Sequence, residues 1–280
     1  MSSDLHSYPS SEHLIAYREA SVAHLRFNRP ERMNAFNNEL MEETIELMHA
    51  LNADEAVQVI VVSGAGRTFS AGFDLKAAAE RQLDSVDKVR AQMSLQFDFI
   101  TQFWTSRKPT IAAVHGYCIA GAFELSLACD LTVCADDALF GEPEVRFGTG
   151  TVAMLFPWLT GPKQAKELVL LGDDKVSAAR ALEMGIVNRV VAPEQVLATA
   201  QNLAQKMARA SSVSVQRSKE AINRAYDIMG MREALRCGLD IDVEINSTPS
   251  FEKTEFARIR AEAGLKAAIA WRDARFADPE

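Results

Sequence analysis

The pattern of apolar and polar positions changes from short strand-like runs in the first half of the chain to helical spacing in the last third. The run Val57–Val62 is β-branched except for Gln58, which is typical of a strand buried on both faces of a sheet. Thr110–Val114 and Leu131–Cys134 have the same character, and Ala120–Ala128 between them has helical spacing. These runs predict a strand–helix–strand unit within a parallel sheet.

The other segments predict a hairpin, two long helices, and then a helical last third with one short strand. In chain order these segments are Leu14–Arg18, Val22–Phe27, a helix to Asn52 capped by Asn37 or Asn38, Ser85–Ser106, Lys163–Leu171, Ser177–Met184, Asn188–Val191, Pro193–Ala210, Ser214–Ile228, Arg232–Asn246 and Thr254–Arg275. The predicted fold class is therefore mixed α/β. We expect a flexible tail over residues 1–12, a core over 13–200 and a helical C-terminal region over 201–280.

Composition narrows the environment and the partners of this chain. Its residues are 48% hydrophobic and 24% charged, which is ordinary for a globular protein with a substantial core. A formal net charge of −8, without a basic stripe, argues against nucleic-acid binding. The serine-rich N-terminus lacks the pattern of a signal peptide. The sequence also contains no apolar run of about 20 residues. We expect a soluble cytoplasmic protein with no membrane partner.

The four cysteines give no indication of a metal site. Cys118, Cys129, Cys134 and Cys237 form no CxxC pair, and no nearby histidines complete a metal-binding pattern. Three of them lie in apolar segments, where cysteine is usually a small buried hydrophobe. This usage fits a reducing cytosol, and we expect no bound metal.

Two glutamates occur where the apolar core would be expected to continue. Glu124 lies three residues after Gly121, at the start of a predicted helix that is otherwise strongly apolar. The unpaired N–H of a first-turn residue and the carboxylate would then lie near one face. The alternative is that Glu124 caps the helix. Glu144 follows Pro143, which fixes the backbone before it, although an isolated segment of this kind could also be a surface loop.

Two carboxylates in one cavity would suit proton transfer on a neutral organic substrate. A third segment, Phe69–Lys76, combines small residues with a turn that leaves backbone N–H groups free for a ligand. A plain turn in which Asp74 caps a helix is the alternative. The order of serine, histidine and acidic residues predicts no catalytic triad, and Ser70 lies in no GxSxG frame.

Five segments in order carry a resemblance to a known family. They are Arg29–Ala35, Phe69–Leu75, Ala113–Leu125, Cys129–Leu131 and Phe140–Glu144. Together they resemble the crotonase superfamily, that is, enoyl-CoA hydratases and isomerases, and the similarity extends from about Ile15 to Phe276. The resemblance implies a spiral of β-β-α turns with a helical C-terminal trimerisation region over 201–280. It also implies a homotrimer or a dimer of trimers.

The same resemblance assigns roles to particular residues. The backbone N–H groups of Phe73 and Gly121 would form the oxyanion hole for a thioester oxygen, and the Phe73 ring would shape the acyl pocket. Glu124 and Glu144 would be catalytic and hold one water between them. Because isomerases of the family commonly keep one carboxylate, the presence of both favours hydration of a 2-enoyl-CoA.

The resemblance also implies a binding site for the acyl-CoA substrate. Its expected residues are Arg32, Met33, Ala35, Ala71, Asp74, Leu75, Lys76, Tyr117 and Pro143. No metal or redox cofactor is expected, since coenzyme A enters as part of the thioester substrate.

The segment after Glu144 departs from the family pattern. Val152, Met154 and Leu155 occupy positions where hydratases of the family carry a glycine-rich stretch. Their side chains would add bulk near the water and the acyl group. An isomerase, a CoA-thioester hydrolase and a non-catalytic acyl-CoA-binding protein therefore stay open as alternatives. Neither the acyl chain nor the pathway follows from the sequence.

Overall fold

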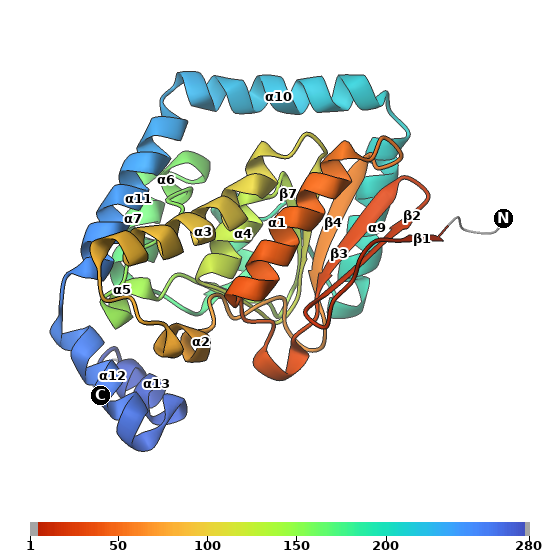
Figure 1. Ribbon diagram of the computed structural model, residues 1–280. Helices are drawn as coiled ribbons and strands as arrows, with labels where there is room; N and C mark the ends of the chain where they lie inside the picture. The colour runs from red at the N-terminus through yellow and green to blue at the C-terminus, as the bar shows by residue number, and fades with distance from the viewer. Residues whose placement is uncertain (1–4, 278–280) are drawn as a thin grey trace.

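A seven-stranded sheet forms the centre of the molecule, and helices cover both of its faces (Figure 1). The computed structural model describes residues 5–277. In spatial order the sheet contains β1 (Leu5–Ser7), β2 (Leu14–Glu19), β3 (Val22–Phe27), β4 (Val59–Gly64), β5 (Thr110–Val114), β7 (Leu131–Ala135) and β10 (Arg189–Val191). The first three strands pair antiparallel, and pairing from β3 onward is parallel. The expected mixed α/β class is confirmed.

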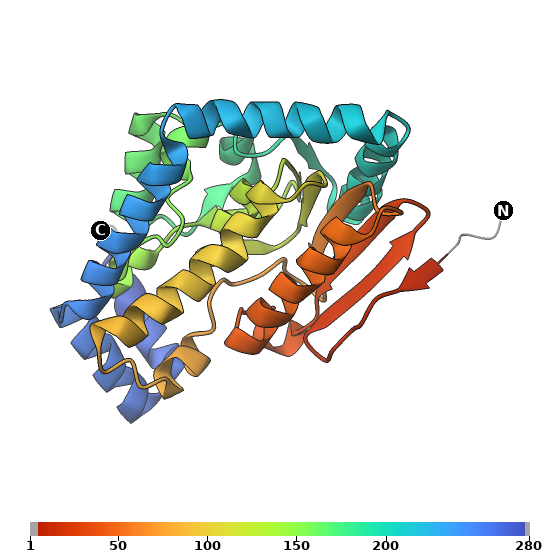
Figure 2. The same cartoon turned by 45° about the horizontal axis from the view of Figure 1, so that its top comes forward.

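The helices lie between the strands and then make up most of the C-terminal third. They are η1 (Pro30–Arg32), α1 (Asn38–Ala53), α2 (Leu75–Glu80), α3 (Val86–Thr105), α4 (Gly121–Ala128), α5 (Glu144–Phe147), α6 (Phe156–Leu159), α7 (Pro162–Leu171), α8 (Ala178–Glu183), η2 (Pro193–Gln195), α9 (Val196–Ala208), α10 (Ser212–Ile228), α11 (Met231–Ser247), α12 (Phe251–Ala263) and α13 (Leu265–Ala274). In Figure 2, α10 extends across one end of the molecule and connects α9 with α11.

Opposite faces of the sheet are covered by α1 with α3 and by α9 (Figure 1). Helix α1 begins where the Asn37 side chain accepts a hydrogen bond from the Leu40 N–H, a normal N-cap arrangement. On the other face, Ala200 and Ala204 of α9 are fully buried. Their small side chains let this helix approach the strands closely.

A second, three-stranded sheet positions both glutamates that were singled out from the sequence. It contains β6 (Tyr117–Ile119), β8 (Leu139–Gly141) and β9 (Val176–Ser177). Strands β6 and β8 are parallel, with Ile119 opposite Gly141. Because α4 follows β6 and α5 closely follows β8, their first turns come together at one edge of this sheet. Strands of three residues are too short to show a period, and the sequence did not predict them.

Three boundaries differ from the sequence-based prediction. Leu5–Ser7 lies within the expected tail but pairs with β2 as an edge strand, while residues 1–4 of that tail lie outside the described part. The expected core boundary at residue 200 falls inside α9, which packs on the central sheet. The single helix expected over Thr254–Arg275 is two helices. They are separated by Gly264, whose φ of +87° favours glycine.

Other features agree with expectation. Cys118, Cys129 and Cys134 are buried and Cys237 is exposed, all as free thiols. Among residues 5–277, no helix combines the length and the apolar character needed to cross a membrane.

Candidate active site

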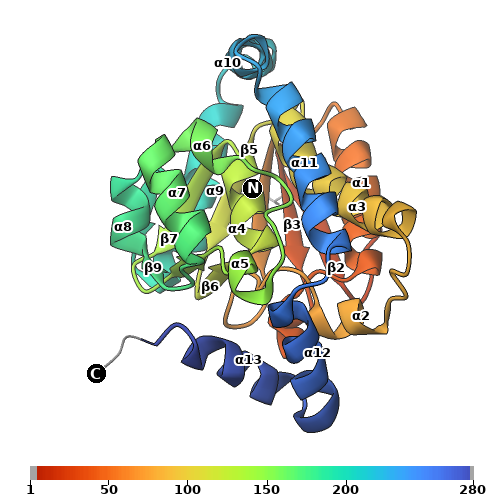
Figure 3. The ribbon, with the colours of Figure 1, turned by 90° about the vertical axis from the view of Figure 1, so that its left-hand side faces the viewer.

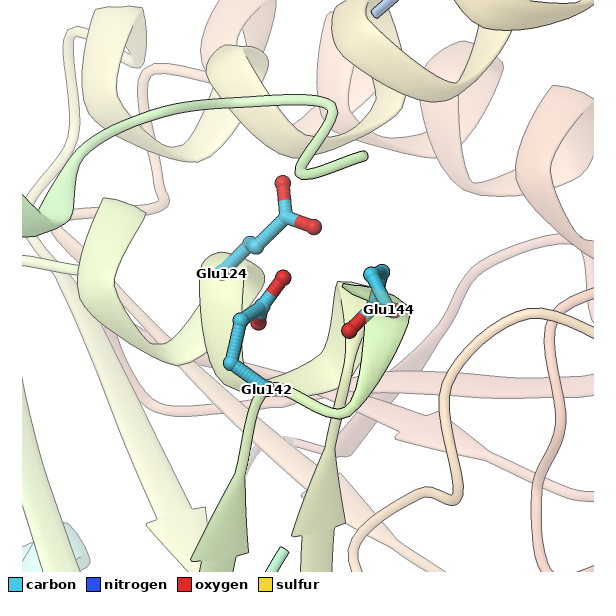
Figure 4. A group of neighbouring side chains, drawn as sticks. All are labelled: Glu124, Glu142 and Glu144. Carbon is cyan, nitrogen blue, oxygen red and sulfur yellow. The ribbon is translucent and has the colours of Figure 1, made fainter. Parts of the chain in front are cut away.

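Three carboxyl groups meet between α4 and α5 (Figure 4). Glu124 is fully buried on α4, Glu144 begins α5, and Glu142 is fully buried just after β8. One oxygen from each carboxyl group lies within 4.8 Å of those from the other two. The two expected glutamates are therefore brought together. Sequence reasoning missed Glu142, although its position two residues before Glu144 was an available signal.

A five-residue segment, which we call the strap (residues 149–153), hydrogen-bonds to these carboxyl groups. The Ala153 N–H donates to Glu124 Oε2 at 2.5 Å, and the Thr151 hydroxyl donates to Glu142 Oε1 at 3.0 Å. The alternative capping role of Glu124 is therefore not observed, because its carboxylate bonds to the strap and the start of its own helix has no side-chain cap. The strap thus holds two of the three carboxyl groups in fixed positions.

A fourth carboxyl group, that of Asp242 on α11, holds the strap from the other side. Its Oδ1 accepts a hydrogen bond of 2.7 Å from Asn246, and the Gly150 N–H also donates to this carboxylate. Gly150 is required at this point, because a Cβ there would lie 2.4 Å from Asp242 Oδ1. Nothing in the local sequence linked Asp242 to the glutamates, which lie about a hundred positions earlier.

Burial changes the protonation of this cluster. Desolvation, with repulsion from Glu144, raises the pKa of Glu124 well above its ordinary value, and the N–H groups of the strap oppose this rise. Desolvation likewise raises the pKa of Glu142 well above its usual range. It raises the pKa of Glu144 to about 7, although a hydrogen bond from Glu142 acts to lower it. Near neutral pH the three groups therefore share protons rather than carrying three charges.

Two oxygens of the expected catalytic pair are left without partners. Glu124 Oε1 and Glu144 Oε2 are buried, and within residues 5–277 neither accepts a hydrogen bond from an N–H group or a hydroxyl group. Buried carboxyl oxygens are costly to leave unpaired. A donor such as water, bound between the two carboxyl groups, would satisfy both oxygens.

The two expected oxyanion-hole N–H groups are also unpaired. Phe36 pairs with the opposite edge of the Phe73 segment, since its N–H donates to Gly72 O (2.8 Å) and its carbonyl accepts from Asp74 N (3.0 Å). The Phe73 N–H therefore points away from Phe36. Gly121 is the first residue of α4, where N–H groups lack helical partners. Within residues 5–277, neither N–H donates a backbone or side-chain hydrogen bond.

The backbone segments that carry the N–H groups of Phe73 and Gly121 are closely packed. A Cβ at Gly72 would lie 3.3 Å from the Gly121 N, and a Cβ at Gly121 would lie 2.5 Å from the Phe73 ring. Ala120, immediately before Gly121, has φ 59° and ψ −133°, a strained conformation for a residue with a side chain. Its N–H donates to Gly141 O at 2.8 Å, which ties this strained turn to the second sheet.

A cavity of about 650 Å³ opens beside this site. Its lining includes eight of the nine expected substrate-binding residues: Arg32, Met33, Ala35, Ala71, Asp74, Leu75, Lys76 and Pro143. Phe73 and Glu144 also line it, whereas Glu124 and Gly121 lie behind the lining. Tyr117 is 44% exposed and lies outside this cavity, so the structure does not bring it to the site.

The position of Asp74 agrees both with a ligand-binding turn and with a plain turn in which Asp74 caps a helix. Its carboxylate accepts hydrogen bonds from the N–H groups of Lys76 and Ala77 at the start of α2, and it forms a 3.0 Å ion pair with Arg29. It is thus a helix cap, as the plain-turn alternative proposed, and it also lines the cavity. Hydrogen bonds to these partners lower the pKa of Asp74 despite the opposing effect of burial, which is the largest single influence.

Residues of the C-terminal helices α12 and α13 line one side of the cavity. Figure 3 shows these two helices beneath α5 and α11. Arg272 of α13 lies 4.6 Å from the centre of the Phe147 ring and forms a 3.2 Å ion pair with Asp174. Phe256 of α12 packs edge-on against Phe147, with ring centres 5.0 Å apart. These contacts join residues about a hundred positions apart or more, so no local pattern in the sequence could predict the wall residues.

The bulky residues after Glu144 affect the site less than expected. Val152 lines the cavity and is 4% exposed. Leu155 is fully buried in the core, and Met154 packs against it from the side of α11, near Gly238. Among the three, only Val152 narrows the space beside Glu144. Two further cavities, of about 570 and 840 Å³, lie along α10 and contain none of the clustered glutamates.

Comparison with known proteins gives consistent results. A family model described as enoyl-CoA hydratase/isomerase matches residues 17–259. A probable enoyl-CoA hydratase from Rhizobium meliloti is 35% identical, covering 81% of this chain and 87% of that protein. A carnitinyl-CoA dehydratase from Escherichia coli K12 is 36% identical over 81% of this chain and 85% of its own length. A solved enoyl-CoA hydratase/isomerase from Xanthobacter autotrophicus Py2 is 46% identical, with a TM-score of 0.94 over 96% of this chain and all of that one.

Proposed function

Because this chain belongs to the enoyl-CoA hydratase/isomerase family, a branch of the crotonase superfamily, we propose that it adds water to a 2-enoyl-CoA thioester. The observation that carries the proposal is the pair of unpartnered oxygens, Glu124 Oε1 and Glu144 Oε2, next to two unpaired backbone N–H groups. An acid–base pair and an oxyanion hole are the two parts that such an addition needs.

In the proposed reaction, the oxyanion hole binds the thioester oxygen and the pair of carboxyl groups transfers the protons. The thioester oxygen accepts hydrogen bonds from the N–H groups of Phe73 and Gly121. One water, held between Glu124 and Glu144, adds its oxygen to Cβ while a carboxylate of the pair takes its proton. Electrons of the double bond move to the thioester as an enolate, which the two N–H groups stabilise. A proton from the carboxyl pair then reaches Cα, so that the net change is addition of one water.

The remaining expectations are proposals that rest on the same assignment. We propose that Arg32 and Lys76, with the apolar Met33, Ala35 and Ala71, bind the coenzyme A part of the substrate at the cavity mouth. No metal or redox cofactor enters this scheme. We further propose a cytoplasmic homotrimer or dimer of trimers. Exposed apolar side chains on α10 and α11 support an assembly of that kind: Val213, Ile222, Ile228 and Ile241.

Incubation with crotonyl-CoA tests the proposed reaction directly. We expect loss of the absorbance of the conjugated thioester and a product whose mass has increased by one water, with the thioester intact. Release of free coenzyme A would identify a hydrolase instead, and a 3-enoyl product from 2-hexenoyl-CoA would identify an isomerase. Binding of crotonyl-CoA without any product would support the non-catalytic alternative.

The third glutamate gives a prediction on pH dependence. Glu142 acts to lower the pKa of Glu144, which is about 7, through a hydrogen bond that a protonated Glu142 donates. Replacement of Glu142 by Leu removes this donor, so the pKa of Glu144 should rise. The acidic limb of the profile of kcat/KM against pH is then expected to move to higher pH. Activity should therefore fall more at pH 6 than at pH 8.

Glu142→Gln is the matched control, because its amide keeps a donor in place of the O–H and an acceptor for Thr151. Its pH profile should stay close to that of the unmodified protein. Equal losses in the Gln and Leu variants would show that Glu142 is needed as an anion. Unchanged profiles in both variants would show that it has no influence on the pair.

A further inference from the structure

The lining of the cavity is largely apolar, but α3 and α11 contribute several polar side chains to it. Gln92 and Gln96, one turn apart on α3, line it from one side, and Asp242 and Asn246 of α11 line it from the other. Gln92 and Asp242 are buried, with 6% and 1% of their surfaces exposed, and Gln96 is 5% exposed. Buried polar side chains are costly unless a partner satisfies them, so this wall indicates a polar occupant.

Two of these side chains still lack partners. Gln92 exchanges two hydrogen bonds of 3.1 Å with Asn38 and is satisfied. Gln96, in contrast, makes no side-chain hydrogen bond within residues 5–277. Asp242 Oδ2 is buried without any partner in the same part of the chain, while Oδ1 of this carboxylate accepts a hydrogen bond from Asn246. Within the described residues, the Asp242 Oδ2 acceptor on α11 and the Gln96 amide on α3 therefore remain free to bind a ligand.

The charges around these polar side chains limit what the occupant can be. Asp242 lies close enough to Glu124 and Glu144 for its charge to raise the pKa of both glutamates. An added carboxylate would therefore be repelled by up to three groups of like charge. Of the cationic residues that line the cavity, Lys253 donates to the Ile245 and Thr248 carbonyls, and Arg272 pairs with Asp174 and Asp273. A neutral group with a hydrogen to donate fits best.

We propose that the preferred substrate is an acyl-CoA whose acyl chain carries a hydroxyl group near the reacting carbons, bound by Asp242 Oδ2 and the Gln96 amide. The hydroxyl donates to the carboxylate and accepts from the amide, so that both unpartnered groups are satisfied. An alkyl chain of the same size would leave both unpaired. This inference rests on the proposed acyl-CoA function and adds the chemical class of the acyl group.

Binding of saturated thioesters tests the inference without requiring the hydration step. Isothermal titration calorimetry would compare 4-hydroxybutyryl-CoA with pentanoyl-CoA, and 5-hydroxypentanoyl-CoA with hexanoyl-CoA, each pair differing by a hydroxyl in place of a methyl. At least one hydroxylated member is expected to bind about tenfold more tightly than its alkyl partner. Succinyl-CoA, which carries a carboxylate, is expected to bind most weakly.

Two variants locate the preference. Asp242→Asn keeps the volume and the contact with Gly150 but replaces the free acceptor, so the tenfold preference should fall to about threefold or less. Gln96→Leu places an apolar side chain on a helix face that already buries Val89, Met93 and Phe99, so it should fold. This variant should bind the alkyl thioesters more tightly than the unmodified protein does.

The outcomes separate this inference from the proposed function. Equal or tighter binding of both alkyl thioesters by the unmodified protein would overturn the hydroxyl preference, as would tightest binding of succinyl-CoA. Neither result would affect the hydratase proposal, which the crotonyl-CoA experiment tests. If none of the thioesters binds, the acyl-CoA function and this inference both fail.

Discussion

Glu144→Gln is expected to lower kcat for crotonyl-CoA hydration by about 10³-fold, the usual scale for loss of a positioned acid–base group. The amide keeps the size of the side chain but cannot accept or deliver the proton in the addition step. Binding of saturated butyryl-CoA should change by less than about threefold, since the N–H groups of Phe73 and Gly121 are unaltered. Stopped-flow absorbance gives the rate, and calorimetry gives the affinity.

Companion variants show whether the two glutamates act as a unit. Glu124→Gln should cause a similar loss, and the double variant should be little worse than either single one, because parts of one mechanism are not additive. Glu31→Gln is the control, since Glu31 lines the mouth of the same cavity and is exposed. Its activity should be unchanged. A Glu144→Gln protein that hydrates a panel of enoyl-CoAs normally would contradict the two-glutamate mechanism.

Gly121→Ala is expected to lower kcat/KM by about 10²–10³-fold, the range seen when one oxyanion donor is lost. The new Cβ would lie 2.5 Å from two atoms of the Phe73 ring, well inside contact distance. Either the ring or the start of α4 must then move. Movement of the start of α4 carries the Gly121 N–H away from that of Phe73, and movement of the ring changes the acyl pocket that it shapes. The measurement is steady-state hydration, together with the affinity for a saturated acyl-CoA.

The control for this substitution is Gly238→Ala, a glycine inside α11. Its added Cβ would meet only Met154 Cβ at 3.5 Å, an ordinary contact. This variant should keep full activity, and its unfolding free energy should rise by about 0.5–1 kcal/mol. Adding Phe73→Leu to Gly121→Ala should recover part of the activity, because it removes the ring that the Cβ meets. Full activity in Gly121→Ala alone would exclude the proposed oxyanion hole.

Features fixed by local patterns were predictable from the sequence. The helix predicted up to Asn52 is α1, and it buries residues at helical spacing, among them Leu40, Thr44 and Leu47. The two catalytic candidates were identified because Glu124 interrupts an apolar helix and Glu144 follows a proline. These positions alone left helix capping and a surface loop open as alternatives, and the resemblance to the crotonase superfamily implied the catalytic role.

Features that depend on distant contacts were not predictable. The second sheet consists of strands of two or three residues, whose stability comes from pairing rather than from propensity. Asp242 and Arg272 reach the site only because α11 to α13 fold back beside it. Tyr117 was expected at the site from its position within a motif, but the side chains of a strand alternate, and this one points outward.

The position of the C-terminal helices has a thermodynamic consequence for any ligand. Residues of α12 and α13 form one wall of the cavity, and the contacts of Arg272 and Phe256 with Phe147 hold that wall in place. A molecule that fills the cavity therefore touches both the core and these helices, and it favours their docked arrangement by mass action. Part of the measured affinity is then the free energy of docking, so a substitution at Arg272 weakens binding without touching the reacting atoms.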